Sequence, residues 1–182
     1  FSPEFLRHYS KTYHPENPDR LKSMVRALKE EGLAKRFFEL PMRKANLEDI
    51  LKVHSPNLLK SLEKLCARGG GKIQLDPETY ASEASYEVAL YAAGGTVAAI
   101  DEIREGSVDR AFMLLRPPGH HATRERSMGF CLINNAAVAA RYAQSQGFAK
   151  IIIVDYDCHH GNGTQEIFYY DDSVGYYSVH QF

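Results

Sequence analysis

The first half of the chain carries apolar residues at helical spacing. This pattern predicts an amphipathic helix over residues 21–31 that ends at Gly32. It predicts three further helices, over residues 46–51, 56–67 and 85–103. The longest of them contains Gly94 and Gly95, although a glycine inside a helix costs about 1 kcal/mol relative to alanine. We therefore expect another element to pack closely against these two glycines.

Outside these helices the pattern changes. Prolines punctuate residues 14–20 and glycines dominate residues 68–72, so both segments are predicted to be loops, the second of them flexible. From residue 111 onward, short apolar runs alternate with helical patterns. The predicted strands cover residues 111–115, 150–154 and 174–179, and the predicted helices cover residues 135–146 and 164–169. Such alternation indicates right-handed crossovers and a parallel sheet, as in the α/β class.

Size, charge and cysteine content limit what the chain can be. Its 182 residues are enough for one domain with a sizeable core. A net charge of −1 creates no field that would attract nucleic acid or an anionic membrane. No apolar run approaches the roughly 20 residues that span a bilayer. Cys66, Cys131 and Cys158 make no disulfide framework and suit a reducing cytosol, so we expect a cytoplasmic protein.

Acidic and histidine side chains follow the apolar run of residues 151–154, which predicts a buried strand. Active sites of open α/β sheets lie at such strand ends. Asp155 opens the segment, and Asp157 and His159 are two positions apart, so in an extended backbone they point to the same side. Aspartate and histidine are ligands of a borderline divalent metal such as zinc. The sequence therefore predicts a metal site after this strand.

A pair of histidines follows the predicted strand over residues 111–115. His120 and His121 are adjacent, so their side chains diverge and would bind a single metal ion only awkwardly. Imidazole titrates near neutral pH, which suits a general acid or base. We interpret the pair as proton-transfer groups beside the metal site.

Three segments, taken in order, give the chain a family resemblance. They read Arg116-Pro117-Pro118-Gly119-His120-His121, Met128-Gly129-Phe130-Cys131 and Asp155-Tyr156-Asp157-Cys158-His159-His160-Gly161. Together they resemble the histone deacetylase family, which includes bacterial deacetylase-like and acetylpolyamine amidohydrolases. The similarity runs from residues 14–20 to residues 177–180. It implies a three-layer α/β/α fold with a central parallel sheet, of the arginase/deacetylase type. The family's domain is longer, so we expect residues 1–182 to be its N-terminal half.

The resemblance also implies a metal centre. It makes Asp157 and His159 two of three zinc ligands. The third ligand, an aspartate, and a tyrosine that binds the oxyanion lie farther along the family's domain, so the 182-residue chain alone is expected to be inactive. Aspartate and histidine suit Fe²⁺ as well as zinc.

The same resemblance gives each histidine of the pair an orienting partner. It pairs His120 with Asp155, and His121 with Asn162. A neutral asparagine stabilises an imidazolium less strongly than a carboxylate does. We therefore expect His121 to stay neutral more easily than His120 and to serve as the general base and then as the acid.

Other positions match the family's substrate-handling parts. Gly129 and Phe130 would line the substrate tunnel, and Cys131 would pack near the site. Arg20 would lie near an internal channel through which acetate leaves. Glu78 lies close to a family acid that grips the substrate backbone, with a solvated loop as the alternative.

Two potassium sites complete the resemblance. One would use main-chain oxygens with one hydroxyl, from Asp155, Asp157, His159, Val179 and Ser178. The other would use carbonyls around Phe168, Asp171 and Val174. Oxygen-only coordination suits a hard cation.

We therefore expect a zinc-dependent amidohydrolase that removes the acetyl group from N-acetyl-lysine or an acetylated polyamine. Two alternatives stay open. One is an inert relative that binds acyl-lysine without cleaving it. The other is a ureohydrolase such as arginase, whose Asp-x-His-x-Asp order differs from that of Asp155, Asp157 and His159 here. No direct nucleic-acid or membrane partner is expected.

Overall fold

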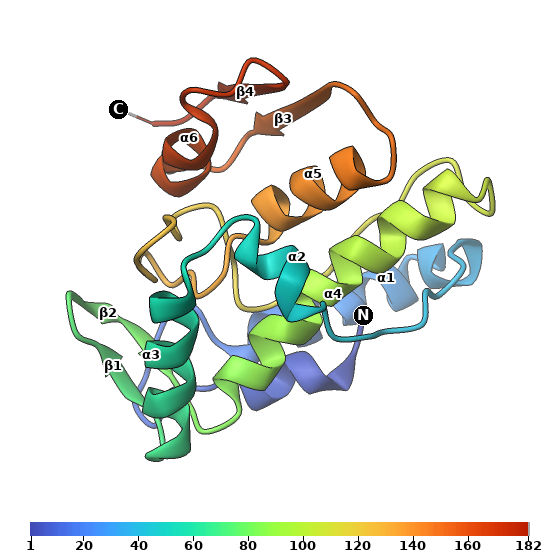
Figure 1. Ribbon diagram of the computed structural model, residues 1–182. Coiled ribbons are helices and arrows are strands. Elements are labelled where there is room, and N and C mark those ends of the chain that lie inside the picture. Colours follow the sequence, from blue (N-terminus) through green and yellow to red (C-terminus); the bar gives the residue numbers. More distant parts are fainter. Residues whose placement is uncertain (182) are drawn as a thin grey trace.

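A long central helix, α4 (Ser85–Arg104), organises the helical part of the protein. The computed structural model describes residues 1–181 (Figure 1). Around α4 lie 3-10 and α-helices, namely η1 (Pro3–Arg7), α1 (Pro18–Glu30), η2 (Leu33–Arg36), α2 (Leu47–Leu51), α3 (Pro56–Ala67) and α5 (Asn135–Ser145). Fully buried residues of α4 such as Ala93 and Val97 pack into a core shared with α3 and α5. On the other side of α4, Val88 packs with Phe5 and Leu21.

The predicted close packing at Gly94 and Gly95 is confirmed. A Cβ at Gly94 would lie 1.9 Å from the carbonyl oxygen of Arg43, so the backbone of the preceding segment crosses the helix at this point. The Ala45 N–H donates to the Leu90 carbonyl across 2.9 Å and fixes the crossing. At Gly95 a Cβ would approach the side chains of Met42 and other residues at 3.0–3.2 Å.

The helix predictions hold to within a few residues at their ends. The largest difference is α1, which begins at Pro18 rather than at residue 21. Asn17 caps it by accepting from the Asp19 N–H at 2.9 Å, and proline suits the first turn. This first turn is polar, so the apolar stripe gives no sign of it.

The loop predicted over residues 68–72 is confirmed for residues 68–70 and wrong for residues 71 and 72, which belong to a strand. It leads into a hairpin of β1 (Gly71–Ile73) and β2 (Asp76–Ala81), which pair antiparallel. A Cβ at Gly70 would lie 2.2 Å from the Ala81 carbonyl oxygen, so glycine permits the close approach of the two chains. A strand as short as β1 has no apolar alternation by which the sequence could predict it.

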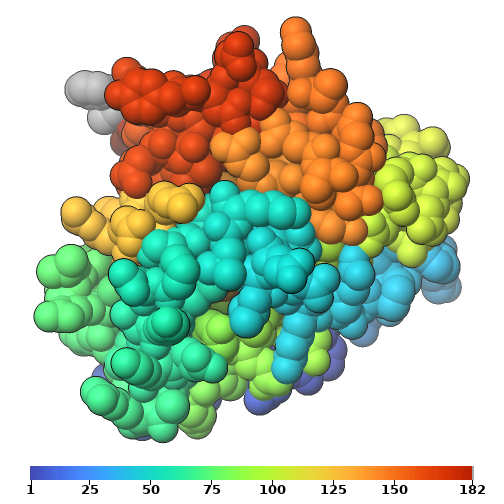
Figure 2. Space-filling model, in the orientation of Figure 1, coloured from blue at the N-terminus to red at the C-terminus, as the bar shows by residue number. Residues whose placement is uncertain are grey.

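The parallel pairing predicted for the C-terminal part is confirmed. β3 (Ile151–Asp155) pairs with β4 (Val174–Ser178) in parallel, and α6 (Asn162–Phe168) forms the crossover. Figure 1 shows this pair beside α5, and in Figure 2 the orange and red C-terminal segments lie together at one side of the molecule.

Two strand predictions differ from the structure. Residues 111–115 form no ladder with another strand in residues 1–181, and a strand needs a hydrogen-bonding partner. β3 is only half covered, because α5 lies on one face while Ile152 and Val154 on the other are 69% and 61% exposed. The apolar run therefore has one open face among the described residues, although the sequence predicts a buried strand.

None of the helices within residues 1–181 has the length and apolar character needed to cross a membrane.

Candidate active site

The candidate site lies where the end of β3 meets the loop that carries His120 and His121. The first turn of α6 joins these two segments, because the Thr164 N–H donates to the His120 carbonyl at 3.1 Å. Asn134, the N-cap of α5, donates from Nδ2 to the Thr164 hydroxyl at 3.1 Å and so links the start of α5 to the first turn of α6. The loop is therefore held by the starts of two helices.

The structure places His120 against Asp155. The distance between His120 Nδ1 and Asp155 Oδ2 is 2.9 Å, and both side chains are mostly buried. A carboxylate can only accept, so His120 Nδ1 is the donor. The hydroxyl of Tyr176, on β4, donates to the same oxygen at 3.0 Å. Tyr176 has no signal in the sequence, because its contact depends on the pairing of β3 with β4.

His121 lies against Asn162, the first residue of α6. Nδ1 of His121 is 2.7 Å from Oδ1 of Asn162, and the amide nitrogen of Asn162 is 3.7 Å from the sulfur of Met128. Burial lowers the pKa of His121, and the nearby His120 and His159 lower it further, against the opposing effect of Asn162. Burial thus favours the neutral form of His121, in which Nδ1–H donates to Asn162 and Nε2 carries the lone pair.

Asp157 and His159 lie together at the exposed rim of the site. Oδ1 of Asp157 is 3.0 Å from Nδ1 of His159 and 3.9 Å from Nε2 of His120. Burial acts to raise the pKa of Asp157, but hydrogen bonds from His159 and the nearby histidines together lower it. The ligand atoms of Asp157, Cys158 and His159 all lie within 4.8 Å of one another. A carboxylate and an imidazole this close fit a divalent metal. Cys158, between the two in the chain, was not predicted as a ligand, although its sulfur lies in the same group.

Two glycines leave room for the histidine pair. A Cβ at Gly161 would lie 2.2 Å from Oδ2 of Asp155 and 3.0 Å from Nδ1 of His120. Gly129 has a φ of +56°, and a Cβ there would lie 2.4 Å from Cδ2 of His121. Any side chain at either position would displace a histidine or its partner.

Phe130 is held in a left-handed conformation beside Gly129. Its φ is +67°, which costs about 1–3 kcal/mol in a residue other than glycine. Two hydrogen bonds from β2 hold it: the Gly129 N–H donates to Oδ2 of Asp76 at 2.6 Å, and the Phe130 N–H donates to Oγ1 of Thr79 at 2.7 Å. The sequence gives no sign of Asp76 and Thr79, because 53 and 51 residues separate them from their partners in this turn and only the fold brings them near.

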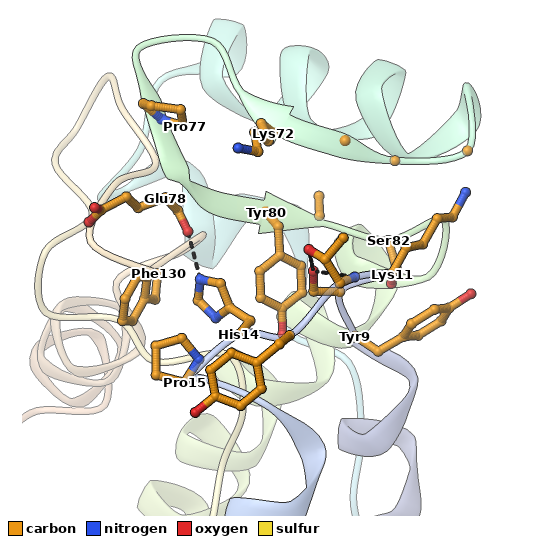
Figure 3. A pocket seen from close by; sticks show the side chains of 17 residues that line it. Tyr9, Lys11, His14, Pro15, Lys72, Pro77, Glu78, Tyr80, Ser82 and Phe130 are labelled. Atoms are coloured by element: carbon orange, nitrogen blue, oxygen red, sulfur yellow. Dashed lines mark hydrogen bonds between the residues drawn. The ribbon is translucent and has the colours of Figure 1, made fainter.

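Glu78 is exposed, whereas Cys131 is buried against the loop that carries the histidine pair. The side chain of Glu78 is exposed, while its carbonyl accepts from His14 at 2.8 Å (Figure 3) and its N–H donates to Oδ1 of Asp76 at 3.2 Å. Glu78 is solvated, as the alternative expected, but it lies in β2 rather than in a loop. Cys131 is fully buried, and burial raises the pKa of its thiol to about 12, so it packs rather than reacts.

Arg20 lines a cavity of about 270 Å³ together with Arg116 and Pro118. Its Nη1 is 4.0 Å from Oε1 of Glu16, whose carboxylate also accepts from Arg116 at 2.6 and 2.8 Å. Burial acts to raise the pKa of Glu16, but hydrogen bonds from His8 and Arg116 outweigh it and lower the pKa to about 2. The buried pair of Glu16 and Arg116 gave no separate signal in the sequence.

The residues of the potassium predictions gather around β3 and β4. Parallel pairing sets Asp155 opposite Ser178, and the Val179 N–H donates to the Asp155 carbonyl at 2.9 Å. On the turn before β4, the Asp171 N–H donates to the Phe168 carbonyl at 3.0 Å. The residues predicted for the first potassium site thus lie close together at the ends of β3 and β4, and those predicted for the second lie close together before β4.

Comparison with known protein families identifies one that matches most of the chain. A family model described as the histone deacetylase domain matches residues 14–182. The chain belongs to the histone deacetylase family. Within it, a probable deacetylase of Archaeoglobus fulgidus is 40% identical over 100% of this chain and 50% of its own length. A probable deacetylase of Methanothermobacter thermautotrophicus is 45% identical over 92% of this chain and 49% of its own length.

The deacetylase fold is shown by a solved structure, that of the HDA15 HD domain. It superposes with a TM-score of 0.93 and 39% identity, over 99% of this chain and 52% of that one. The predicted arginase/deacetylase-like α/β fold is thereby confirmed. This deacetylase-family chain spans about half the length of the curated relatives and of the solved structure that it matches.

Proposed function

We propose that the natural protein containing this chain hydrolyses the acetyl amide of N-acetyl-lysine or a related acetylated amine in a metal-dependent reaction. One observation carries the proposal most directly. His121, neutral and fixed by Asn162 at 2.7 Å, lies beside the carboxylate–imidazole pair of Asp157 and His159. A base with a free lone pair and a donor set for a divalent metal thus share one site.

Asp157 and His159 would hold zinc, and Fe²⁺ fits the same two side chains. When bound, the metal would lower the pKa of water and polarise the amide carbonyl. The family adds a third ligand and an oxyanion-binding tyrosine beyond these residues. We therefore expect residues 1–182 alone to be inactive.

The two histidines would divide the proton chemistry. Nε2 of His121 takes the proton from the attacking water and then returns it to the leaving amine. His120 donates from Nδ1 to the carboxylate of Asp155, so it would act as a positioned electrostatic partner beside the metal. The proposed base is therefore the histidine held by the neutral partner.

Other residues would handle the substrate and stabilise the loop. Gly129 lies against His121, and Gly129 and Phe130 would form a wall that suits the apolar stem of a lysine side chain. Arg20 lines the cavity through which acetate would leave. Structural K⁺ would bind the main-chain oxygens around Asp155 and Phe168.

The test is acetate release by the purified natural protein, stripped of metal and reloaded with zinc or anaerobically with Fe²⁺. Acetyl-lysine peptides, an acetylated polyamine and arginine would be offered in parallel. Acetate release that needs the metal supports the proposal. Peptide binding without acetate release would indicate an inert relative, and urea release from arginine would indicate a ureohydrolase.

A further inference from the structure

The carboxylate of Asp155 accepts hydrogen bonds from three separate parts of the chain. Its Oδ2 accepts from Nδ1 of His120 at 2.9 Å and from the hydroxyl of Tyr176 at 3.0 Å. Its Oδ1 accepts from the Asp157 N–H at 3.2 Å. A carboxylate with donors on both oxygens cannot rotate without losing one of them. The orientation of Asp155 thus depends on Tyr176 and on the backbone as well as on His120.

The sheet determines where the Tyr176 side chain lies. Parallel pairing sets Tyr176 opposite Ile153, and both side chains are partly buried. Val154 and Tyr177, the next pair of the ladder, are 61% and 64% exposed and lie on the other face, because side chains alternate along a strand. Within residues 1–181, Tyr176 therefore lies on the covered face of the strand pair and Tyr177 on the open one.

A glycine leaves room for the polar atoms that meet at this point. A Cβ at Gly161 would lie 2.2 Å from Oδ2 of Asp155 and 2.5 Å from the hydroxyl oxygen of Tyr176. It would also lie 3.0 Å from Nδ1 of His120. The backbone before α6 thus confines the tyrosine hydroxyl to the same carboxylate oxygen that the histidine uses.

The carboxylate in turn sets the direction of the second nitrogen of His120. Nε2 of His120 is 3.9 Å from Oδ1 of Asp157, one of the two proposed metal ligands. Because the imidazole ring is rigid, the hydrogen bond at Nδ1 also fixes where Nε2 points. A tilt of the Asp155 carboxylate would therefore move Nε2 of His120 relative to Asp157.

We propose that Tyr176 is a positioning residue for the hydrolysis and acts through Asp155 on His120. Its hydroxyl fixes the orientation of the carboxylate. As a second donor to Oδ2, it also weakens the attraction of that oxygen for the Nδ1 proton of His120. The inference rests on the proposed function and adds a residue to it.

The first measurement follows the Nδ1 proton of His120 by NMR, in the zinc-loaded natural protein with ¹⁵N-labelled histidine. The loss of this signal in His120→Ala assigns it. Tyr176→Phe keeps the ring and removes only the donor, so Oδ2 of Asp155 would bind the His120 proton alone and more strongly. The signal should therefore move downfield, as it does for protons in shorter hydrogen bonds to a carboxylate.

Tyr177→Phe is the matched control for this measurement. It removes a hydroxyl from the next residue of the same strand, on the exposed face. It should leave the His120 signal where it is. An unchanged signal in Tyr176→Phe, or an equal shift in both variants, would overturn the proposal.

The second measurement is steady-state acetate release from an acetyl-lysine peptide. Tyr176→Phe should lower kcat about fivefold, the scale of one hydrogen bond, with KM and zinc content unchanged. In the His120→Ala background the same substitution should change kcat less than about twofold, because its target is gone. A general loss of stability would lower kcat in both backgrounds. Additive losses, or an unchanged kcat in the single variant, would overturn the proposal.

Failure of the proposed function would give a different pattern. If the wild-type protein yields no acetate while the NMR signal moves in Tyr176→Phe alone, the hydrolase proposal is wrong and the positioning role fails with it, although the shared oxygen of Asp155 stands. If the wild-type protein yields acetate and Tyr176→Phe matches it in both measurements, only the positioning role is wrong.

Discussion

His121 donates from Nδ1 to Oδ1 of Asn162 across 2.7 Å, and this contact leaves Nε2 free to accept a proton. The neighbouring His120 contacts a carboxylate instead, Asp155, at 2.9 Å. Two adjacent residues of one type therefore have partners of different charge. That difference separates their expected roles.

The first prediction follows from this contrast. In the natural protein, His121→Ala should lower kcat at least about a hundredfold, because general acid–base groups contribute on that scale. Metal content should stay unchanged. His120→Ala should lower kcat less. Steady-state rates with elemental analysis check this, and a larger loss for His120→Ala would contradict the argument from Asn162.

Gly129 gives a second prediction, because the ring of His121 fills the position that a Cβ at residue 129 would occupy. Gly129→Ala should lower kcat at least about tenfold by moving the imidazole, since small displacements of a catalytic group are costly. Gly147→Ala is the matched control. Gly147 has a φ of +99° with nothing within 4 Å, so its substitution adds backbone strain without a clash. Equal activity of the two variants would show that the contact with His121 is unimportant.

The buried pair of Glu16 and Arg116 gives a prediction about stability. Glu16→Gln leaves the guanidinium of Arg116 buried without a counter-charge, which should cost about 3–5 kcal/mol of unfolding free energy. Asp19→Asn, in an exposed pair with Lys22, should change stability little. Chemical denaturation compares the two. Similar losses of unfolding free energy in the two variants would mean that the buried pair stabilises the protein no more than the exposed pair does.

His54 should make stability depend on pH. It is fully buried: its Nε2 accepts from the Asn134 N–H at 2.9 Å, and its Nδ1 donates to the Thr123 carbonyl at 2.8 Å. Burial lowers its pKa from 6.5 to about 4. The unfolded chain therefore binds more protons between these values, so stability is full above pH 6.5 and is lost as pH falls toward 4, by about 3 kcal/mol. Denaturation of the wild-type protein and His54→Gln across this range checks it, and parallel pH profiles would contradict it.

Much of the site could be predicted because its signals are local in sequence. Asp157 and His159 are two positions apart, and the histidine pair follows an apolar run, so residue type and spacing already indicate chemistry. The contacts of His120 with Asp155 and of His121 with Asn162 came from the family resemblance, and the structure contains both.

The parts that could not be predicted depend on pairing between distant segments. Tyr176 reaches Asp155 only because β4 pairs with β3, and Asp76 reaches Gly129 only because β2 lies beside that turn. The same reason explains the error at residues 111–115. An apolar run indicates a tendency to form a strand, but a strand exists only where a partner accepts its hydrogen bonds.

The central claim is that Asp157 and His159 hold the metal that the hydrolysis needs. The most direct test measures zinc content and acetate release on the same preparation of the natural protein, for the wild type and for Asp157→Ala and His159→Ala. We predict that both variants lose zinc and activity together, because each lacks one of the two side chains that meet at 3.0 Å. Stoichiometric zinc in both variants would contradict the account.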